Sequence, residues 1–152
     1  MHRLIIGLVF TTLSLSLPAF AQGTADEAKA MLTKAIAAVK ADKAKALETF
    51  SKGEGGFKDR DLYVYCANLS DGKLVGHFNP QLRGQDVRTL KDANGVNFGQ
   101  VNYDIAAKAK DGEIVQTPPF LFPKPGPDKT PVSKVAFVSK IGDIYCGVGY
   151  YK

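Results

Sequence analysis

The sequence predicts an α+β fold in which one long amphipathic helix precedes a small β-sheet. Residues 24–50 repeat apolar side chains at helical spacing. Later segments are rich in β-branched and aromatic residues, which is typical of strands. These segments are 62–69, 74–78, 113–117, 132–141 and 143–151. The first and last of them carry the two cysteines, Cys66 and Cys146. The expected order is therefore helix, two strands, short helices and three strands.

The first 21 residues have the organisation of a secretory signal peptide. Met1–Arg3 is a short basic start, residues 4–17 are apolar, and Ala19-Phe20-Ala21 has small residues at the two positions that signal peptidase recognises. The apolar run is shorter than the ~20 residues that a membrane-spanning helix needs. We therefore expect cleavage after Ala21. Residues 22–152 would then form one exported domain, periplasmic or secreted and not embedded in the membrane.

The composition of this expected mature domain excludes some classes of protein. Cleavage removes Arg3 and leaves 19 basic and 15 acidic residues, a formal net charge of +4. The lysines are scattered and no arginine-rich run is present, which argues against nucleic-acid binding. The small positive excess is compatible with an anionic ligand. The length suits one hydrophobic core and not two domains.

The long helix has clear start and stop signals. Thr24-Ala25-Asp26-Glu27 has the form of a capping box. The apolar stripe then runs to Phe50, loosens around Asp42 and Lys43, and ends before the glycines at 53, 55 and 56. We expect a single long helix that is exposed or kinked at the loosened point.

The strands and short helices follow from turn chemistry. Residues 70–73 predict a turn that makes 62–69 and 74–78 a hairpin. Residues 81–91 predict one or two helical turns, and Asn97 is placed to cap a second helix that ends before Gly112. Residues 118–131 hold five of the eight prolines and are expected to be a loop, with residues 120–122 pressed inward. The last two strands join at Gly142-Asp143.

The two cysteines predict which strands are neighbours. An even cysteine count in an exported protein indicates a disulfide, and a cross-strand bridge requires adjacent strands. Alternation places Cys66 on the aliphatic face of its strand and Cys146 on the aliphatic face of the last strand. The opposite faces carry tyrosines and small residues. They are Tyr63, Tyr65, Ala67, Tyr145, Gly147 and Gly149. One face therefore suits the long helix, and the other is an aromatic floor with gaps, as a pocket requires.

The chain resembles a single Cache domain, a PAS-like extracytoplasmic sensor module of bacterial receptors and kinases, over residues 28–151. The resemblance depends on the order and spacing of several short motifs. They are Asp61-Leu62-Tyr63-Val64-Tyr65, Asp71-Gly72, His77, Asn79-Pro80, residues 82–86, residues 90–95, Phe122-Pro123-Lys124-Pro125-Gly126 and the closing residues 147–151.

This resemblance implies a five-stranded antiparallel sheet with the long helix on one face and a ligand pocket on the other. It also implies that the first and last strands are adjacent at the centre. Members of the family usually continue into a membrane helix and a signalling domain, whereas this sequence stops at Lys152. We expect a stand-alone module that passes its occupancy to a membrane receptor or histidine kinase.

The candidate ligand contacts are aromatic residues with a few cationic ones. Tyrosines would form the floor, aromatic residues the walls, and a basic group would pair with a carboxylate. They are Tyr63, Tyr65, His77, Arg83, Tyr103, Phe120, Phe122, Lys124 and Tyr145. Of the basic residues we favour Arg83, because its guanidinium can engage both carboxylate oxygens.

Catalysis and cofactors are not expected. His77 is the only histidine after residue 21, and no G-x-S-x-G motif, phosphate loop, calcium loop or haem motif is present. Two cysteines and one histidine do not make a zinc site. A hydrolase centred on His77 is the least favoured hypothesis. The sequence favours a binding or sensing module for a small anionic metabolite, an organic acid or amino acid. The alternative is a non-catalytic interaction domain whose pocket is filled by its own side chains.

Overall fold

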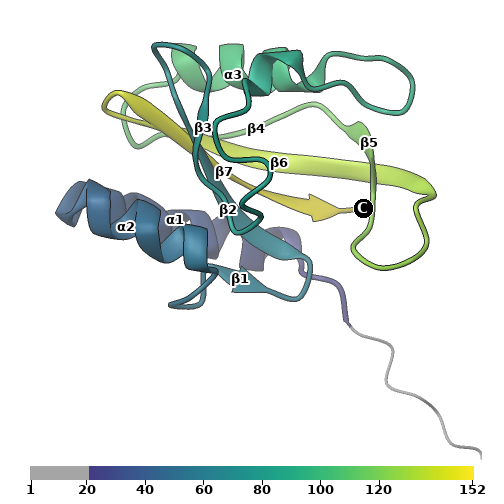
Figure 1. Cartoon of the computed structure of the whole chain (residues 1–152), viewed down its shortest axis with the longest axis horizontal. Coiled ribbons are helices and arrows are strands. Elements are labelled where there is room, and N and C mark those ends of the chain that lie inside the picture. The colour runs from purple at the N-terminus through teal and green to yellow at the C-terminus, as the bar shows by residue number, and fades with distance from the viewer. Residues whose placement is uncertain (1–20) are drawn as a thin grey trace, which may run out of the picture.

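The computed structural model describes residues 21–152. The expected signal peptide, apart from its last residue, lies outside the described residues. Figure 1 shows a layered arrangement, with two helices below an antiparallel sheet and a third helix above it. In the part of the chain that the structure describes, no helix is long and apolar enough to cross a membrane.

Two helices, and not one, cover the first face of the sheet. They are α1 (Ala25–Ala41) and α2 (Lys43–Lys52). Thr24 forms the predicted capping box with Glu27. The prediction of a single helix was wrong, because Asp42 has an extended backbone and its carboxylate accepts a hydrogen bond from the Lys45 N–H at 3.0 Å. Asp42 thus ends α1 and caps α2, at the place where the apolar stripe loosens.

The sheet has seven strands, five of which match the predicted segments. These are β2 (Leu62–Asn68), β3 (Leu74–Gly76), β4 (Ile114–Gln116), β6 (Pro131–Ile141) and β7 (Ile144–Tyr151). The two additional strands are β1 (Lys58–Asp59) and β5 (Phe120–Pro123). The order is β1-β2-β7-β6-β4, with β3 paired to β2 and β5 paired to β6.

The strand β5 corrects the expectation that residues 118–131 are a loop. Phe120, Leu121 and Phe122 pair with residues 132–134 of β6. Prolines lack the N–H that a central strand must donate, but they are tolerated in a strand that pairs on one side. The inward placement of Phe120 is confirmed, since this side chain is buried.

The second face of the sheet is covered by the segment between β3 and β4. It includes the short 3₁₀ helix η1 (Val87–Thr89) and the helix α3 (Phe98–Lys108). Asn97 caps α3 as predicted, because its side chain accepts a hydrogen bond from the Gln100 N–H. Figure 1 shows α3 on the side of the sheet opposite α1 and α2.

The disulfide joins the two central strands. Cys66 of β2 and Cys146 of β7 are direct partners in the register, with their Cα atoms 4.0 Å apart. Both cysteines are fully buried in the aliphatic core between the sheet and the helices α1 and α2. The predicted bridge and the predicted adjacency of the first and last strands are thus confirmed. The tyrosine face carries a separate core beneath α3 and η1.

Candidate functional site

A cavity of about 90 Å³ lies between the tyrosine face of the sheet and the segments that cover it. Aromatic and aliphatic side chains from both sides line it, with a few polar groups. The lining residues are Tyr63, Tyr65, Leu74, His77, Leu82, Val87, Leu90, Phe98, Gly99, Asn102, Phe120, Phe122, Lys134, Ala136, Tyr145 and Gly149. Such an apolar cavity with a few converging polar groups is typical of a small-molecule site. No aspartate or glutamate is among these lining residues.

The floor comes from the central strands, and its glycine gaps are occupied. Tyr65 and Tyr145 meet edge to face with ring centroids 6.2 Å apart. A Cβ on Gly147 would lie 2.5 Å from the Tyr65 ring, and a Cβ on Gly149 would lie 2.6 Å from Cε of Lys134. The glycines therefore make room for two side chains of the same chain, and the cavity lies above them.

Lys134 is the cation of this cavity. Its side chain comes from β6 and is only 3% exposed. The ammonium donates one hydrogen bond, to the Tyr63 hydroxyl at 3.2 Å. It also lies 4.8 Å from the centre of the Tyr63 ring, 5.1 Å from that of Phe122 and 4.7 Å from that of Tyr151. Among residues 21–152 no carboxylate lies within ion-pair distance of this ammonium.

His77 supplies a neutral polar group at the same cavity. It is buried, and its Nδ1 accepts a hydrogen bond from the Asn79 N–H at 2.9 Å. Burial lowers the pKa of His77 to about 4, and the positive charges of Lys134 and Arg83 act in the same direction. The ring is therefore neutral at pH 7. Because Nδ1 is an acceptor, the proton sits on Nε2, which is a hydrogen-bond donor.

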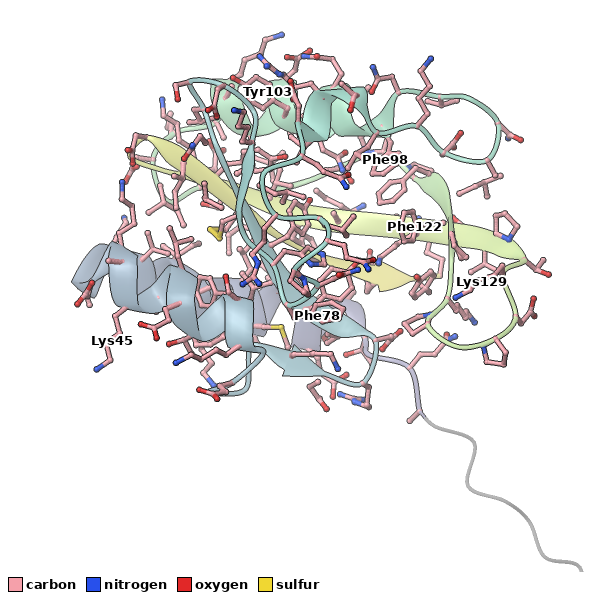
Figure 2. The ribbon with its side chains drawn as sticks, viewed as in Figure 1. Lys45, Phe78, Phe98, Tyr103, Phe122 and Lys129 are labelled. Carbon is pink, nitrogen blue, oxygen red and sulfur yellow. A yellow bond between two sulfur atoms is a disulfide. The ribbon has the colours of Figure 1, made fainter. Side chains whose placement is uncertain are left out.

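Aromatic residues at the start of α3 and on β5 form one wall of the cavity. Phe98 stacks on Phe120 with ring centroids 4.3 Å apart and meets Phe122 edge to face at 6.0 Å. Figure 2 shows Phe98 and Phe122 approaching each other from these two elements. The Asp92 carboxylate holds β5 in place, since it accepts a hydrogen bond from the Leu121 N–H at 3.1 Å.

The cavity brings together most of the predicted contact residues. Tyr63, Tyr65, His77, Phe120, Phe122 and Tyr145 all line it. Three others do not. Arg83, the favoured carboxylate partner, is exposed. Tyr103 meets Tyr145 edge to face, with ring centroids 6.0 Å apart, and its hydroxyl donates a hydrogen bond to the Leu69 carbonyl oxygen at 2.6 Å. Lys124 borders a different hollow, beside Asp61.

Sequence reasoning missed Lys134, Asn102 and Phe98. Lys134 lies in a strand between exposed and buried positions, and nothing in the local pattern distinguishes it from a solvated lysine. Two glycines of the neighbouring strand β7, Gly147 and Gly149, were a usable signal. They showed that large side chains from neighbouring strands must cross the floor, although not which ones.

Solved structures that share this fold include the following three. A methyl-accepting chemotaxis protein from Vibrio parahaemolyticus RIMD 2210633 is 23% identical, with a TM-score of 0.63 over 83% of this chain and 86% of that one. A periplasmic sensor domain of a chemotaxis protein is 26% identical, with a TM-score of 0.59 over 81% and 88%. A third structure, described as a Cache chemosensory domain that recognises carboxylic acids, is 23% identical, with a TM-score of 0.57 over 83% and 86%.

The family comparison covers nearly the whole sequence. No curated protein matches the chain. The family described as Single Cache domain 2 matches residues 16–151. With the central pairing of β2 and β7 and the seven-stranded antiparallel sheet, this match identifies the chain as a sensor-type domain. The chain belongs to the Single Cache domain 2 family.

Proposed function

We propose that this domain is a periplasmic sensing module that binds a small organic acid in the cavity above Tyr65 and Tyr145, with Lys134 as the charge partner of the carboxylate. The observation that carries the proposal is the buried ammonium of Lys134. A buried charge is costly unless it is paired and hydrogen-bonded. Here it has one hydrogen bond and three aromatic neighbours, and two of its N–H donors are left for a ligand.

The lining favours an organic acid over an amino acid. A carboxylate would receive hydrogen bonds from the Lys134 ammonium and from Nε2–H of His77. An amino acid also carries an ammonium group, which would need an anionic partner in the cavity. The lining residues supply none. The third structural relative, which recognises carboxylic acids, is consistent with this preference.

The volume restricts the size of the ligand. Pockets for drug-sized ligands occupy ~300–1,000 Å³, whereas this cavity has about 90 Å³. We therefore propose acids of two or three carbons, whose short apolar part contacts the rings of Phe120 and Phe122. A longer or branched acid would require the aromatic wall to move. Occupancy would be passed to a membrane receptor or histidine kinase.

The test is calorimetric titration and thermal shift with acetate, propionate, lactate, pyruvate, citrate and alanine. At a hundredfold excess over Kd, a ligand should stabilise the domain by about 2.7 kcal/mol. We expect a shift with one or more short monocarboxylates and none with citrate or alanine. Lys134→Met should weaken binding by about thirtyfold or more. The matched control is Lys140→Met, on the same strand but outside the cavity lining, which should bind normally.

A second candidate function is a protein-interaction domain with a filled pocket. The occupation of the glycine gaps by Tyr65 and Lys134, together with the small volume, favours it. The two candidates give different results in the same titration. If neither the native chain nor Lys140→Met shows a thermal shift with any of the acids, the result supports the interaction domain.

A further inference from the structure

Asp61, immediately before β2, has a buried carboxylate that is only half satisfied. The residue is 9% exposed. Its Oδ1 accepts a hydrogen bond from the Gly23 N–H at 2.7 Å. Its Oδ2 is the one buried side-chain polar atom in residues 21–152 that has no hydrogen-bond partner. Leaving a buried charged acceptor unpaired is costly, so an unfilled position beside Oδ2 points to a missing cationic donor.

The chain segment next to this carboxylate is held in place. Nη1 of Arg60 donates to the Gln22 carbonyl oxygen at 3.4 Å. A Cβ on Gly23 would overlap the side chain of Leu62, so only glycine permits this close approach. These contacts hold the backbone nitrogen of Gln22 in place, one residue before the Gly23 nitrogen that binds Asp61. One residue spans at most ~3.8 Å between Cα atoms.

The neighbouring cations are engaged elsewhere. Arg60 pairs with Glu27 at 2.8 Å and with Asp59 at 2.8 Å. The ammonium of Lys124 lies 5.8 Å from the centre of the Tyr151 ring. A hollow of about 380 Å³ bordered by Ala21, Gln22, Arg60, Asp61, Lys124 and Pro125 gives access to the carboxylate. The site thus has an anion, space and a tethered nitrogen.

We propose that Asp61 binds the new amino terminus of the processed chain. The inference is independent of the sensing function and depends on the expected cleavage after Ala21. Hydrolysis of the Ala21–Gln22 bond adds one water molecule, leaving a carboxylate on Ala21 and an amino group on Gln22. The neutral amide nitrogen becomes an ammonium with three donors, which pairs with Oδ2. The start of β2, which carries the cavity tyrosines, then gains an additional charged contact after export and processing.

The test is a double-mutant cycle on protein exported and processed from the full chain. Gln22→Ala is used throughout, because a free terminal glutamine can cyclise and lose its charge. One arm is Asp61→Asn. The other arm inserts one alanine between Ala21 and residue 22, which moves the ammonium outward by one residue. Intact mass spectrometry establishes each terminus, and denaturant titration gives the folding equilibrium constant.

We expect Asp61→Asn to lower the folding equilibrium constant by about tenfold or more in the processed chain. With the inserted alanine, the same substitution should have an effect of about twofold or less. Equal effects in both chains would overturn the proposal, as would a terminus other than residue 22 in the chain without the insertion. Asp59→Asn, a neighbouring exposed carboxylate, should show no such coupling.

Two further measurements distinguish a pair between Asp61 and the amino terminus from a pair between Asp61 and Lys124. If Lys124 is the true partner of Asp61, Lys124→Met will abolish the effect of Asp61→Asn, which would refute the assignment. The native chain gives a direct chemical measurement. A paired ammonium is protected, so Gln22 should cyclise several-fold more slowly in the native chain than in Asp61→Asn. Equal rates of cyclisation would contradict the proposal.

Discussion

Opening the disulfide between Cys66 and Cys146 should cause a large loss of stability in this domain. The bridge closes a loop with a sequence separation of 80 residues. In the chain-entropy description, a loop of this length gives about 4.5 kcal/mol at 25 °C. At an unfolding entropy of about 2.1 cal/mol/K per residue over the described domain, the loss corresponds to a fall in Tm of about 15 °C.

The assay compares three samples by thermal unfolding. They are the oxidised protein, the protein unfolded and refolded in reductant, and the Cys66→Ala/Cys146→Ala variant. The reduced protein keeps both sulfur atoms and isolates the effect of the bond. The double variant also leaves a small cavity in a fully buried position and should fall slightly further. A reduced protein whose Tm stays within about 3 °C of the oxidised one would refute this reasoning.

Three further changes test the site and its supports. The pKa of His77 is lowered to about 4 in the folded chain, whereas the unfolded ring titrates near 6.5. Because the unfolded chain binds more protons between these two values, the free energy of unfolding should fall by about 3 kcal/mol as the pH drops from about 6.5 to about 4. His77→Gln should flatten this pH dependence in denaturant titrations. Gly147→Ala should destabilise the domain by about 1–3 kcal/mol because its methyl group meets the Tyr65 ring, and Tyr65→Ala should restore much of the loss; additive losses would contradict the packing argument. Asp92→Ala should weaken ligand binding several-fold without contacting the ligand, because β5 loses its hydrogen bond at Leu121; unchanged affinity by calorimetry would show that β5 is held without it.

The fold was largely predictable because its signals are local. Alternation separated an aliphatic face from a tyrosine face, and the cysteines then identified the adjacent strands. The errors arose where local and tertiary information disagree. The apolar stripe loosens at Asp42, but only the capping geometry of Asp42 shows that the helix ends and restarts. The prolines around Phe120 suggested a loop, whereas pairing with β6 makes a strand.

The site was less predictable than the fold. Tyr63, Tyr65, Tyr145 and His77 could be placed by strand alternation and the resemblance, and they do line one cavity. The cation could not. Arg83 and Lys134 are both basic residues flanked by mixed sequence, and only the packing of β6 against β7 buries one of them. Whether these residues contact a ligand stays a prediction.

The sheet divides its side chains between two independent tasks. Successive residues along β2 and β7 point alternately into the core that faces α1 and α2 and toward the cavity on the α3 side. Substitutions on opposite faces share few partners, so their energetic effects should add. Ligand preference can therefore drift through the tyrosine side while the sulfur-bridged side stays constant. Related domains can thus differ in the ligand that they bind while they keep the same fold.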